Sequence, residues 1–539
     1  MAPAETFTDK ERARLAPFVS DLDTPVFALL RLPETTRGAL FARYSRYPGT
    51  LRRLLLDEFG EELERGTGGT DAPGGGTRAE ALYERVLGEY GDDSVAQLGG
   101  AHVACEWASN VLTKVLQRPR LGAYLEQSTR YIAYDRPMPG GGFRYHREPA
   151  LGPSYERAMD ELFVAYGAIL EALPAWLSER FPRVDGTAAA AHERAVRAKA
   201  LDLARGLLPA AALSHVGIFA SGQTFERLIL HLRAHPLPEA NRCGEELLAA
   251  MRVAAPSFVT RVDRPERGGE WVAFLQRRAA GERNAAERLG LTAGAGTVAD
   301  AGAVSGATEQ PSGTRLLHAE GDEQRLLAAL VFEQSSADEA QARAALARMS
   351  DAERAALLGE LLGGRGNRRH LPGRGLETLR YRFEIVSDYG AFRDLQRHRM
   401  LTAQWQALTP HLGAEVPEEL DAAGFGAPFR AAIERSREAW QELLDAGLPD
   451  HAPYALCLAY RVRYVLELDA REAMHVIELR SGGEGHAAYR AIARQMHAEI
   501  AAVHPAVAAA MTHLDAGEES RLERCEAETR RERRSDGRL

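Results

Sequence analysis

Two stretches of this 539-residue chain decide how it is organised: LQRPRLGAYLEQSTRY at residues 116–131 and LQRHRMLTAQWQALTP at residues 395–410. Both carry the pattern Leu-Gln-Arg-x-Arg followed by Leu or Met. Eight residues after its second arginine, the first copy has Ser128 and the second has Ala407. Between the arginines, the second copy has His398 and the first has Pro119. The chain therefore carries one motif twice, and each copy is broken at a different place.

The sequence around the two motifs repeats as well. Ahead of the first, VFALLRLPETTRGALFARYSR begins with an apolar run at residue 26 that predicts a strand, then a turn and an amphipathic helix. Ahead of the second, TRLLHAEGDEQRLLAALVFEQS has the same layout, and long helical patterns follow both motifs. A period of about half the chain indicates a duplicated domain and not a solenoid.

A segment rich in Gly, Ala, Ser and Thr at residues 290–315 has no apolar periodicity and predicts a flexible linker between the copies. The expected fold class is α/β (α+β), with two domains of similar topology, each a twisted sheet with long flanking helices. We expect a first domain at 15–285, a linker at 286–314, a second domain at 315–515 and a charged tail at 516–539.

Composition limits the function classes. The net charge of −9 argues against a general nucleic-acid binder, which needs a basic balance. The four cysteines form no CxxC pair, and no carboxylate joins the late histidines at ligand spacing, so we predict no metal site. The polar N-terminus, and the lack of a run of eighteen apolar residues, predict a cytoplasmic protein without a signal peptide.

The motif's chemistry follows from its spacing. Arginines at i and i+2 cannot share one helix face, but an extended segment places both on one side with the residue between them on the other. Two guanidinium groups on one side form a fork for phosphates. An isolated Arg-x-Arg is most often a solvated charge run, but repetition at matching positions favours a function.

These motifs resemble the signature of the flavin-dependent thymidylate synthases, in which Arg-His-Arg is followed after seven residues by Ser and then by Arg-Tyr. Other segments agree in order: GDDSVAQL around Ser94, a glutamate (Glu377) twenty residues before Arg397, ARGLLP at 204–209, DAREAMHVIELR at 469–480 and GHAAYR at 485–490. The resemblance covers most of both halves, although neither copy of the signature is intact.

The resemblance implies transfer of a methylene group from methylenetetrahydrofolate to C5 of dUMP, giving dTMP. It implies FAD as cofactor and NADPH as reductant, with no obligate covalent nucleophile on the enzyme. The protein then acts by orientation and electrostatic stabilisation. The family is typically a homotetramer whose sites are shared between subunits, so a duplicated chain is expected to form a homodimer with its long helices at the centre.

Carried over position by position, the resemblance implies complementary losses in the two copies. Its catalytic residues would be Ser128, Arg130 and Arg397. Its nucleotide-binding residues would be Glu126, Gln127, Ser128, Arg130, Arg205, Arg397 and Arg490, and its flavin-binding residues Ser94, Glu377, Arg397, His398, Arg399 and Arg471. The first half has Glu245 where the final arginine is expected, and the second has Pro453 where the Leu-Pro arginine is expected. One composite site would be complete and its twin degenerate.

Departures from the family leave the substrate open. Asp394 stands where the family has glutamine and Asp469 where it has asparagine, and Asp92 or Asp93 replaces an early histidine. A related flavoenzyme acting on another uracil, and a non-catalytic paralogue that binds nucleotide or flavin, remain alternatives.

Overall fold

The computed structural model of the chain describes residues 6–24, 27–44, 47–60, 97–138, 140–183, 187–291, 311–362, 364–517 and 522. The chain forms two compact units. Unit 1 is Met1–Ala108, Val115–Gln127 and Ser214–Gly294, and unit 2 is Ser109–Lys114, Ser128–Leu213 and Ala295–Leu539. The units do not follow the halves of the sequence, because a long segment of the first half belongs to the unit that contains the second half.

Unit 1 contains a three-stranded sheet in the order β1-β3-β2, formed by β1 (Gly100–Ser109), β2 (Gly122–Glu126) and β3 (Leu213–Ser221). Strands β2 and β3 are antiparallel, and Ala123 lies opposite Phe219. The helices of this unit are α1 (Asp9–Leu15), α2 (Glu34–Tyr44), α3 (Leu51–Glu58), α9 (Gly222–Ala234), α10 (Pro238–Ala254) and α11 (Glu270–Arg288), with the short turns η5 (Pro256–Val259) and η6 (Pro265–Gly269).

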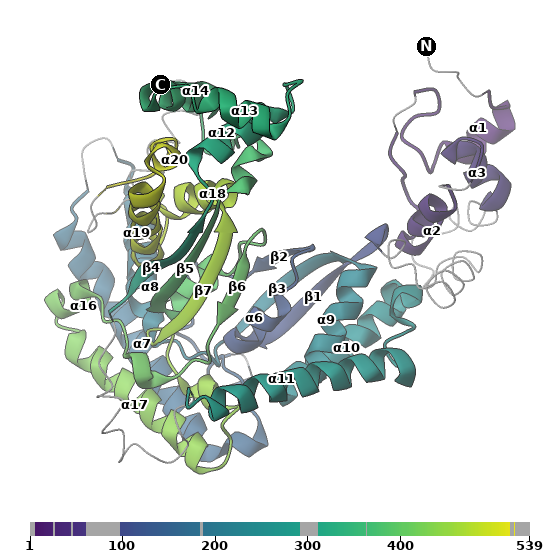
Figure 1. The fold of residues 1–539 in the computed structure, drawn as a ribbon. Coiled ribbons are helices and arrows are strands. Elements are labelled where there is room, and N and C mark those ends of the chain that lie inside the picture. The colour runs from purple at the N-terminus through teal and green to yellow at the C-terminus, as the bar shows by residue number, and fades with distance from the viewer. Residues whose placement is uncertain are drawn as a thin grey trace. The chain divides into compact units, whose positions relative to one another are not determined.

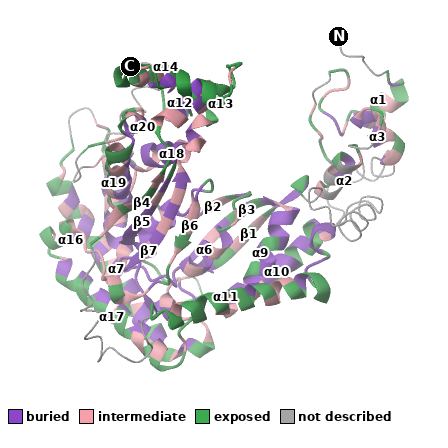
Figure 2. Cartoon of the chain, viewed as in Figure 1, coloured by how far each residue is buried: buried purple, intermediate pink, exposed green. Residues whose placement is uncertain are grey.

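Unit 2 contains a four-stranded antiparallel sheet in the order β4-β5-β7-β6 (Figure 1). Its strands are β4 (Gly313–Glu320), β5 (Arg380–Asp388), β6 (Thr402–Trp405) and β7 (Arg461–Asp469). Alternate side chains are buried from Arg380 to Ile385 of β5 and from Val462 to Asp469 of β7, because one face of the sheet packs on the core (Figure 2). On the other face Arg382 of β5 pairs with Glu467 of β7 at 2.6 Å.

The remaining helices contribute to unit 2. They are α6 (Asn110–Leu116), which continues into unit 1, α7 (Gly152–Arg180), α8 (Ala189–Ala204), α12 (Glu323–Phe332), α13 (Glu339–Leu346), α14 (Asp351–Leu362), α15 (Tyr389–Leu395), α16 (Glu418–Ala422), α17 (Gly426–Asp445), α18 (Ala470–Arg480), α19 (Ala487–Val503) and α20 (Pro505–Ala509). Short turns are η3 (Pro149–Leu151), η4 (Arg205–Leu207), η7 (Arg374–Thr378), η8 (Pro410–Leu412) and η9 (Ala452–Ala455).

The two sheets confirm the duplication. In each, a strand leads directly into a short helix and a second strand (β1-α6-β2 and β5-α15-β6), and a third strand pairs between the two (β3 and β7). The pairing register also matches. Ala123 and Thr402 occupy the same position in the two copies, and so do Phe219 and Glu467. Ala123 lies opposite Phe219 in the first copy, and Thr402 lies opposite Glu467 in the second. A register preserved in two copies fixes which side chains reach each face. The expected α/β (α+β) class with two similar domains is therefore confirmed.

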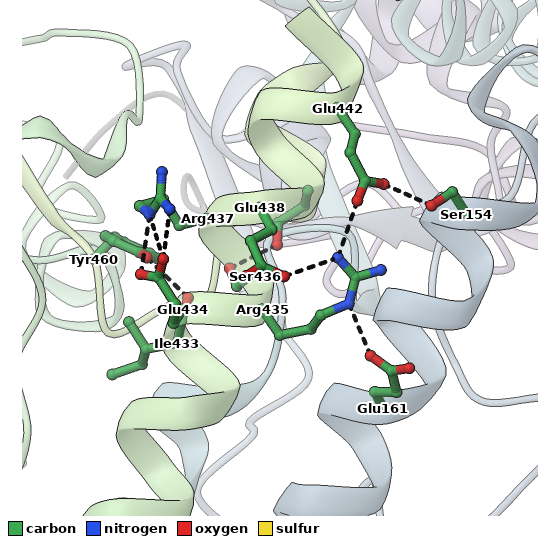
Figure 3. A network of polar contacts seen from close by, with 11 residues as sticks. Ser154, Glu161, Ile433, Glu434, Arg435, Ser436, Arg437, Glu438, Glu442 and Tyr460 are labelled. Carbon is green, nitrogen blue, oxygen red and sulfur yellow. Dashed lines mark hydrogen bonds and ion pairs between the residues drawn. The ribbon is translucent and has the colours of Figure 1, made fainter. Parts of the chain in front are cut away.

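Helix α7 is the one helix of the described residues that is long and apolar enough to cross a membrane by length and composition. Its buried residues recur at helical spacing, from Tyr155 through Leu162 to Leu177, and it packs against α8 and α17. Figure 3 shows the polar margin of the α7–α17 contact: Arg435 donates to Glu161 at 2.8 Å and to Glu442 at 3.2 Å. These contacts are those of a helix that packs one face against the rest of its domain.

The strand–helix openings predicted for the two halves have different outcomes. The strand predicted to begin at residue 26 is wrong for residues 27–32, which form only an isolated bridge between Val19 and Leu29 before α2. The strand–helix opening of the second half is confirmed by β4 and α12.

Helix α11 extends three residues beyond the expected domain boundary at residue 285, and the expected linker and tail lie largely outside the described residues. The domain boundaries stay a prediction.

Candidate functional site

The site begins at the turn that follows β2. Ser128 Oγ accepts a hydrogen bond from the backbone N–H of Arg130 at 3.2 Å, which closes a tight local turn. Arg130 reaches from this turn to Asp202, near the end of α8, in a bidentate ion pair of 2.6 and 2.7 Å. Burial disfavours the charged guanidinium, but the Asp202 carboxylate outweighs burial and raises the pKa of Arg130. Both members of the pair are therefore charged.

Arg130 also binds the second half of the chain. Its Nη1 donates to the Tyr489 hydroxyl at 2.9 Å, and its Nη2 donates to the Glu484 carbonyl at 3.1 Å. His486 Nε2 lies 3.2 Å from the carbonyl oxygen of Asp202. Residues more than 350 positions apart in sequence thus meet inside unit 2.

Arg205 follows α8 at the start of η4, and its side chain is only 4% exposed. Its Nη1 lies 3.6 Å from Asp394 Oδ2, whereas its Nη2 is buried and has no hydrogen-bond partner among the described residues. A Cβ at Gly390 would lie 3.2 Å from Nη2 and 2.8 Å from Asp388 Oδ1. Glycine is needed at position 390 because the guanidinium packs against the first turn of α15.

Asp394 connects the arginines of the two halves. Arg205 comes from the first half, and Arg397 of the second motif lies 3.7 Å from the other Asp394 oxygen. Burial alone would raise the pKa of Asp394, but Arg397 and Arg205, followed by Arg480 and Arg130, hold it well below its usual range. We call Arg130, Arg205, Arg397 and Arg480, with Asp394 and Asp202, the arginine cluster. All of its members belong to unit 2.

His398 lies beside the cluster and is buried. Its Nε2 accepts a hydrogen bond from Arg480 Nε at 2.9 Å, and its Nδ1 lies 3.3 Å from Glu472 Oε1. Burial, and then the charge of Arg480, lower the pKa of His398 to about 3. The imidazole is therefore neutral, with its proton on the nitrogen that faces Glu472. In the motif, His398 is buried between the half-buried Arg397 and the exposed Arg399. These residues lie in a turn and not in the extended segment that the spacing led us to expect.

The other residues expected to bind flavin lie near the start of α18. Glu377 accepts two hydrogen bonds from Arg374, at 2.9 and 3.0 Å, and lies 3.8 Å from Arg471. Arg471 also donates to the Pro372 carbonyl at 2.9 Å. Glu472 follows Arg471 and faces His398, and His398 accepts a hydrogen bond from Arg480 of the arginine cluster. Glu377, Arg374 and Arg471 are therefore connected to that cluster through Glu472 and His398. Ser94 lies outside the described residues.

Arg490 has the contacts of a capping residue. Its side chain is 2% exposed, and its Nε donates to the Ser481 carbonyl at the end of α18. Helices α10 and α19 each have 17 residues, so the fourth residue of α10, Asn241, matches Arg490. Asn241 likewise donates to carbonyls at the end of the preceding helix. The expected counterpart Glu245 is wrong, because that assignment is four residues out of register.

Glu126 and Gln127 belong to unit 1, whereas the chain from Ser128 onward belongs to unit 2. Glu126 is buried and accepts a hydrogen bond from Gln117 Nε2 at 2.8 Å. The roles of these two residues in binding nucleotide stay predictions. No group of three or more potential metal ligands occurs within the part of the chain that the structure describes.

Sequence reasoning missed several members of the site: Asp202, Arg480 and Tyr489 carry no motif of their own. It noted Asp394 only as a departure from the family. A weak signal was available, because Asp202 lies three residues before Arg205 and Arg480 closes the same helix that Arg471 opens. The converging guanidinium groups can bind an anion, and the orphaned Arg205 Nη2 marks a position for an acceptor.

Comparison with known proteins gives matches along most of the chain. The family described as thymidylate synthase complementing protein matches residues 52–257 and again 315–506. A UPF0159 protein of Chlamydia muridarum is 35% identical, covering 97% of this chain and 98% of that protein. UPF0159 proteins of Chlamydia pneumoniae and Thermoplasma acidophilum are 36% and 30% identical, each covering 93% of this chain and, respectively, 94% and 99% of the relative.

Among solved structures, the chain is similar to a UMP/dUMP methylase, PolB from Streptomyces cacaoi, bound with 5-Br dUMP. The identity is 17%, the TM-score is 0.31, and the match covers 38% of this chain and 96% of that one.

Proposed function

The chain belongs to the thymidylate synthase complementing protein family in two tandem copies, and from this premise we propose that it methylates C5 of a uracil nucleotide. The specific reaction proposed is flavin-dependent transfer of the methylene of methylenetetrahydrofolate to dUMP, giving dTMP. FAD would be the cofactor and NADPH the reductant. The bound flavin would supply the hydride that reduces the transferred methylene to a methyl group.

One observation carries the proposal: arginines from both copies converge around one carboxylate inside a single unit. Arg130 and Arg205 come from the first copy, and Arg397 comes from the second. The second copy alone lacks this set, because Thr409 and Pro453 stand where the first copy has Arg130 and Arg205. Converging guanidinium groups repel one another, so the cluster is best explained as a binding site for an anionic ligand. A nucleotide phosphate has the required charge and acceptors.

The residues beside the cluster fit a cofactor as well. His398 is held neutral and oriented by Arg480 and Glu472, so its ring has a fixed position and adds no charge. Arg399 is exposed next to it, and Arg471 opens α18. We propose that these residues, with Glu377 and Arg397, hold FAD, and that Ser128, Arg130 and Arg205 bind the nucleotide. The chain's own contribution is to orient the uracil ring and neutralise charge.

The test is turnover by the purified protein. We expect a bound flavin, visible as the yellow colour of the purified protein, and dTMP formed from dUMP with NADPH and methylenetetrahydrofolate. The gene should also allow a thymidine-requiring bacterial strain to grow without thymidine. Ser128→Ala should abolish rescue, and Arg130→Ala should weaken nucleotide binding by roughly 1.5–3 kcal/mol.

The matched control is Ala407→Ser, which restores the serine of the second copy but leaves the complete site unchanged. We expect normal rescue from this variant. A flavin-free protein that still binds nucleotide would contradict the proposed reaction and support a non-catalytic paralogue. Bound flavin with turnover only on another uracil substrate would correct the substrate alone.

A further inference from the structure

Asp394 is surrounded by arginines but makes no short bond to Arg205 or Arg397. Its two oxygens lie 3.6 Å from Arg205 Nη1 and 3.7 Å from Arg397 Nη1. A charge-assisted bond between such groups is normally about 2.7–2.9 Å long. Asp394 therefore attracts both guanidinium groups electrostatically, but it forms no short hydrogen bond with either of them.

The other carboxylate of the cluster behaves differently. Asp202 is fully engaged by Arg130 through two bonds of 2.6 and 2.7 Å. With four guanidinium groups and two carboxylates, the cluster has an excess of two positive charges. Asp388, which also interacts with Arg205, has a pKa that burial raises to about 6, and its ionisation lowers that excess. The excess is therefore one to two positive charges, depending on the ionisation of Asp388, and the cluster suits an anion of that charge.

Arg205 supplies a second, independent observation. Its Nη2 is buried without a hydrogen-bond partner among the described residues, although the whole side chain is only 4% exposed. Leaving a buried charged donor unsatisfied costs roughly 1–3 kcal/mol or more. A ligand oxygen at this position would remove that cost.

We propose that Asp394 is a resident counter-ion, which holds Arg205 and Arg397 together in the free protein and lowers the affinity of the cluster for the phosphomonoester that binds there. Identifying the ligand as a phosphomonoester rests on the proposed function, whereas the role of Asp394 does not. Asp394 is a specificity-determining residue in this account, because its negative charge sets the ligand charge that the cluster accepts.

Inorganic phosphate is the probe that tests this role without turnover. Titration calorimetry at fixed ionic strength would compare the wild-type chain with Asp394→Asn, which keeps the shape and removes the charge. We expect the variant to bind phosphate at least about ten-fold more tightly, because a nearby negative charge has been removed. The matched control is Glu434→Gln, which makes the same change in net charge at an exposed pair on α17 (Figure 3) and should leave the affinity unchanged.

Equal or weaker phosphate binding by folded Asp394→Asn would overturn the inference. The variant is also expected to be less stable without ligand, because Arg205 and Arg397 lose their shared counter-ion. The rise in Tm on adding phosphate is therefore a second measurement that works for a marginal variant, and it should be larger for Asp394→Asn than for the wild type. An equal or smaller rise contradicts the proposal.

A comparison of dUMP with inorganic phosphate separates this role from direct recognition of the base. If Asp394→Asn weakened dUMP binding but left phosphate binding unchanged, Asp394 would be a ligand of the uracil ring and the counter-ion role would be wrong. If phosphate bound more tightly but the enzyme showed no turnover, the counter-ion role would stand and the proposed reaction would fail.

Discussion

At the scale of single residues, His398 gives a prediction about pH. Its pKa is lowered from 6.5 to about 3 in the folded chain, because the ring is buried beside Arg480. Below pH 6.5 the unfolded chain therefore binds a proton that the folded chain does not. The contribution of His398 to stability is complete above pH 6.5 and is lost as the pH falls toward 3. His398→Gln, which keeps an acceptor for Arg480, removes this dependence.

We expect the difference in free energy of unfolding between the wild type and His398→Gln to shrink steadily as the pH is lowered across this window. Urea unfolding at a series of pH values would measure it. Parallel curves for the two proteins would show that His398 is not held neutral.

Gly390 gives a second prediction at this scale. An alanine in place of a helical glycine usually stabilises a protein by roughly 0.5–1 kcal/mol. At position 390 the new Cβ would lie 2.8 Å from Asp388 Oδ1 and 3.2 Å from Arg205 Nη2, so Gly390→Ala should instead lower stability and weaken phosphate binding. Gly359→Ala on α14 is the control, because a Cβ there has nothing within 4 Å. Stabilisation by both variants would mean that the contact with Arg205 is not tight.

At the scale of elements, a buried ion pair fixes the chain around α18. Arg365 and Glu478 are 4% and 0% exposed and make two bonds of 2.5 and 2.7 Å. Glu478 also accepts from the backbone N–H of His513, and Arg365 donates to the Ala510 carbonyl. The pair therefore connects the segment before η7, helix α18 and the residues that follow α20.

Glu478→Gln leaves the buried charge of Arg365 without its partner, and we expect it to lower the free energy of unfolding by roughly 3–5 kcal/mol. The control is Glu161→Gln, which breaks the more exposed pair with Arg435 (Figure 3) and should cost about 1 kcal/mol or less. Chemical denaturation measures both values. Equal losses would mean that burial does not govern the strength of these pairs.

At the scale of the whole molecule, the two copies differ on one face of their sheets. In unit 2 this face is polar, because Arg382 bonds both Glu467 and Gln404. At the matching positions of unit 1 are Phe219 and Leu125, which are 45% and 80% exposed. Exposed apolar side chains of this size are typical of an interface, and the ring of His102 lies against Phe219 on the same face.

We propose that the protein is a cytoplasmic homodimer, and that this apolar face contributes to the contact between subunits. Light scattering should give about twice the chain mass of 58.9 kDa at micromolar concentration. Leu125→Glu should shift the mass toward the monomer, whereas Gln404→Glu at the matching position of the other copy should not. A monomeric wild type would contradict the homodimer, and a dimeric Leu125→Glu would exclude this face from its interface.

The sequence by itself determined the duplication and much of the residue set. Repeated motifs at fixed spacing are visible in the chain, because a strand, a short helix and a second strand are local structures with local signals. The complementary losses were visible for the same reason: Pro119 and Ala407 stand at positions that the other copy fills with His398 and Ser128.

Only the tertiary structure decided which groups meet. Asp202, Arg480 and Tyr489 are ordinary residues on three different helices, and they enter the site because helices far apart in sequence pack together. It also decided that residues 128–213 leave the first half and join unit 2, which places arginines of both copies around Asp394. Burial and charge pairing depend on contacts between distant segments, and no local pattern in the sequence contains those contacts.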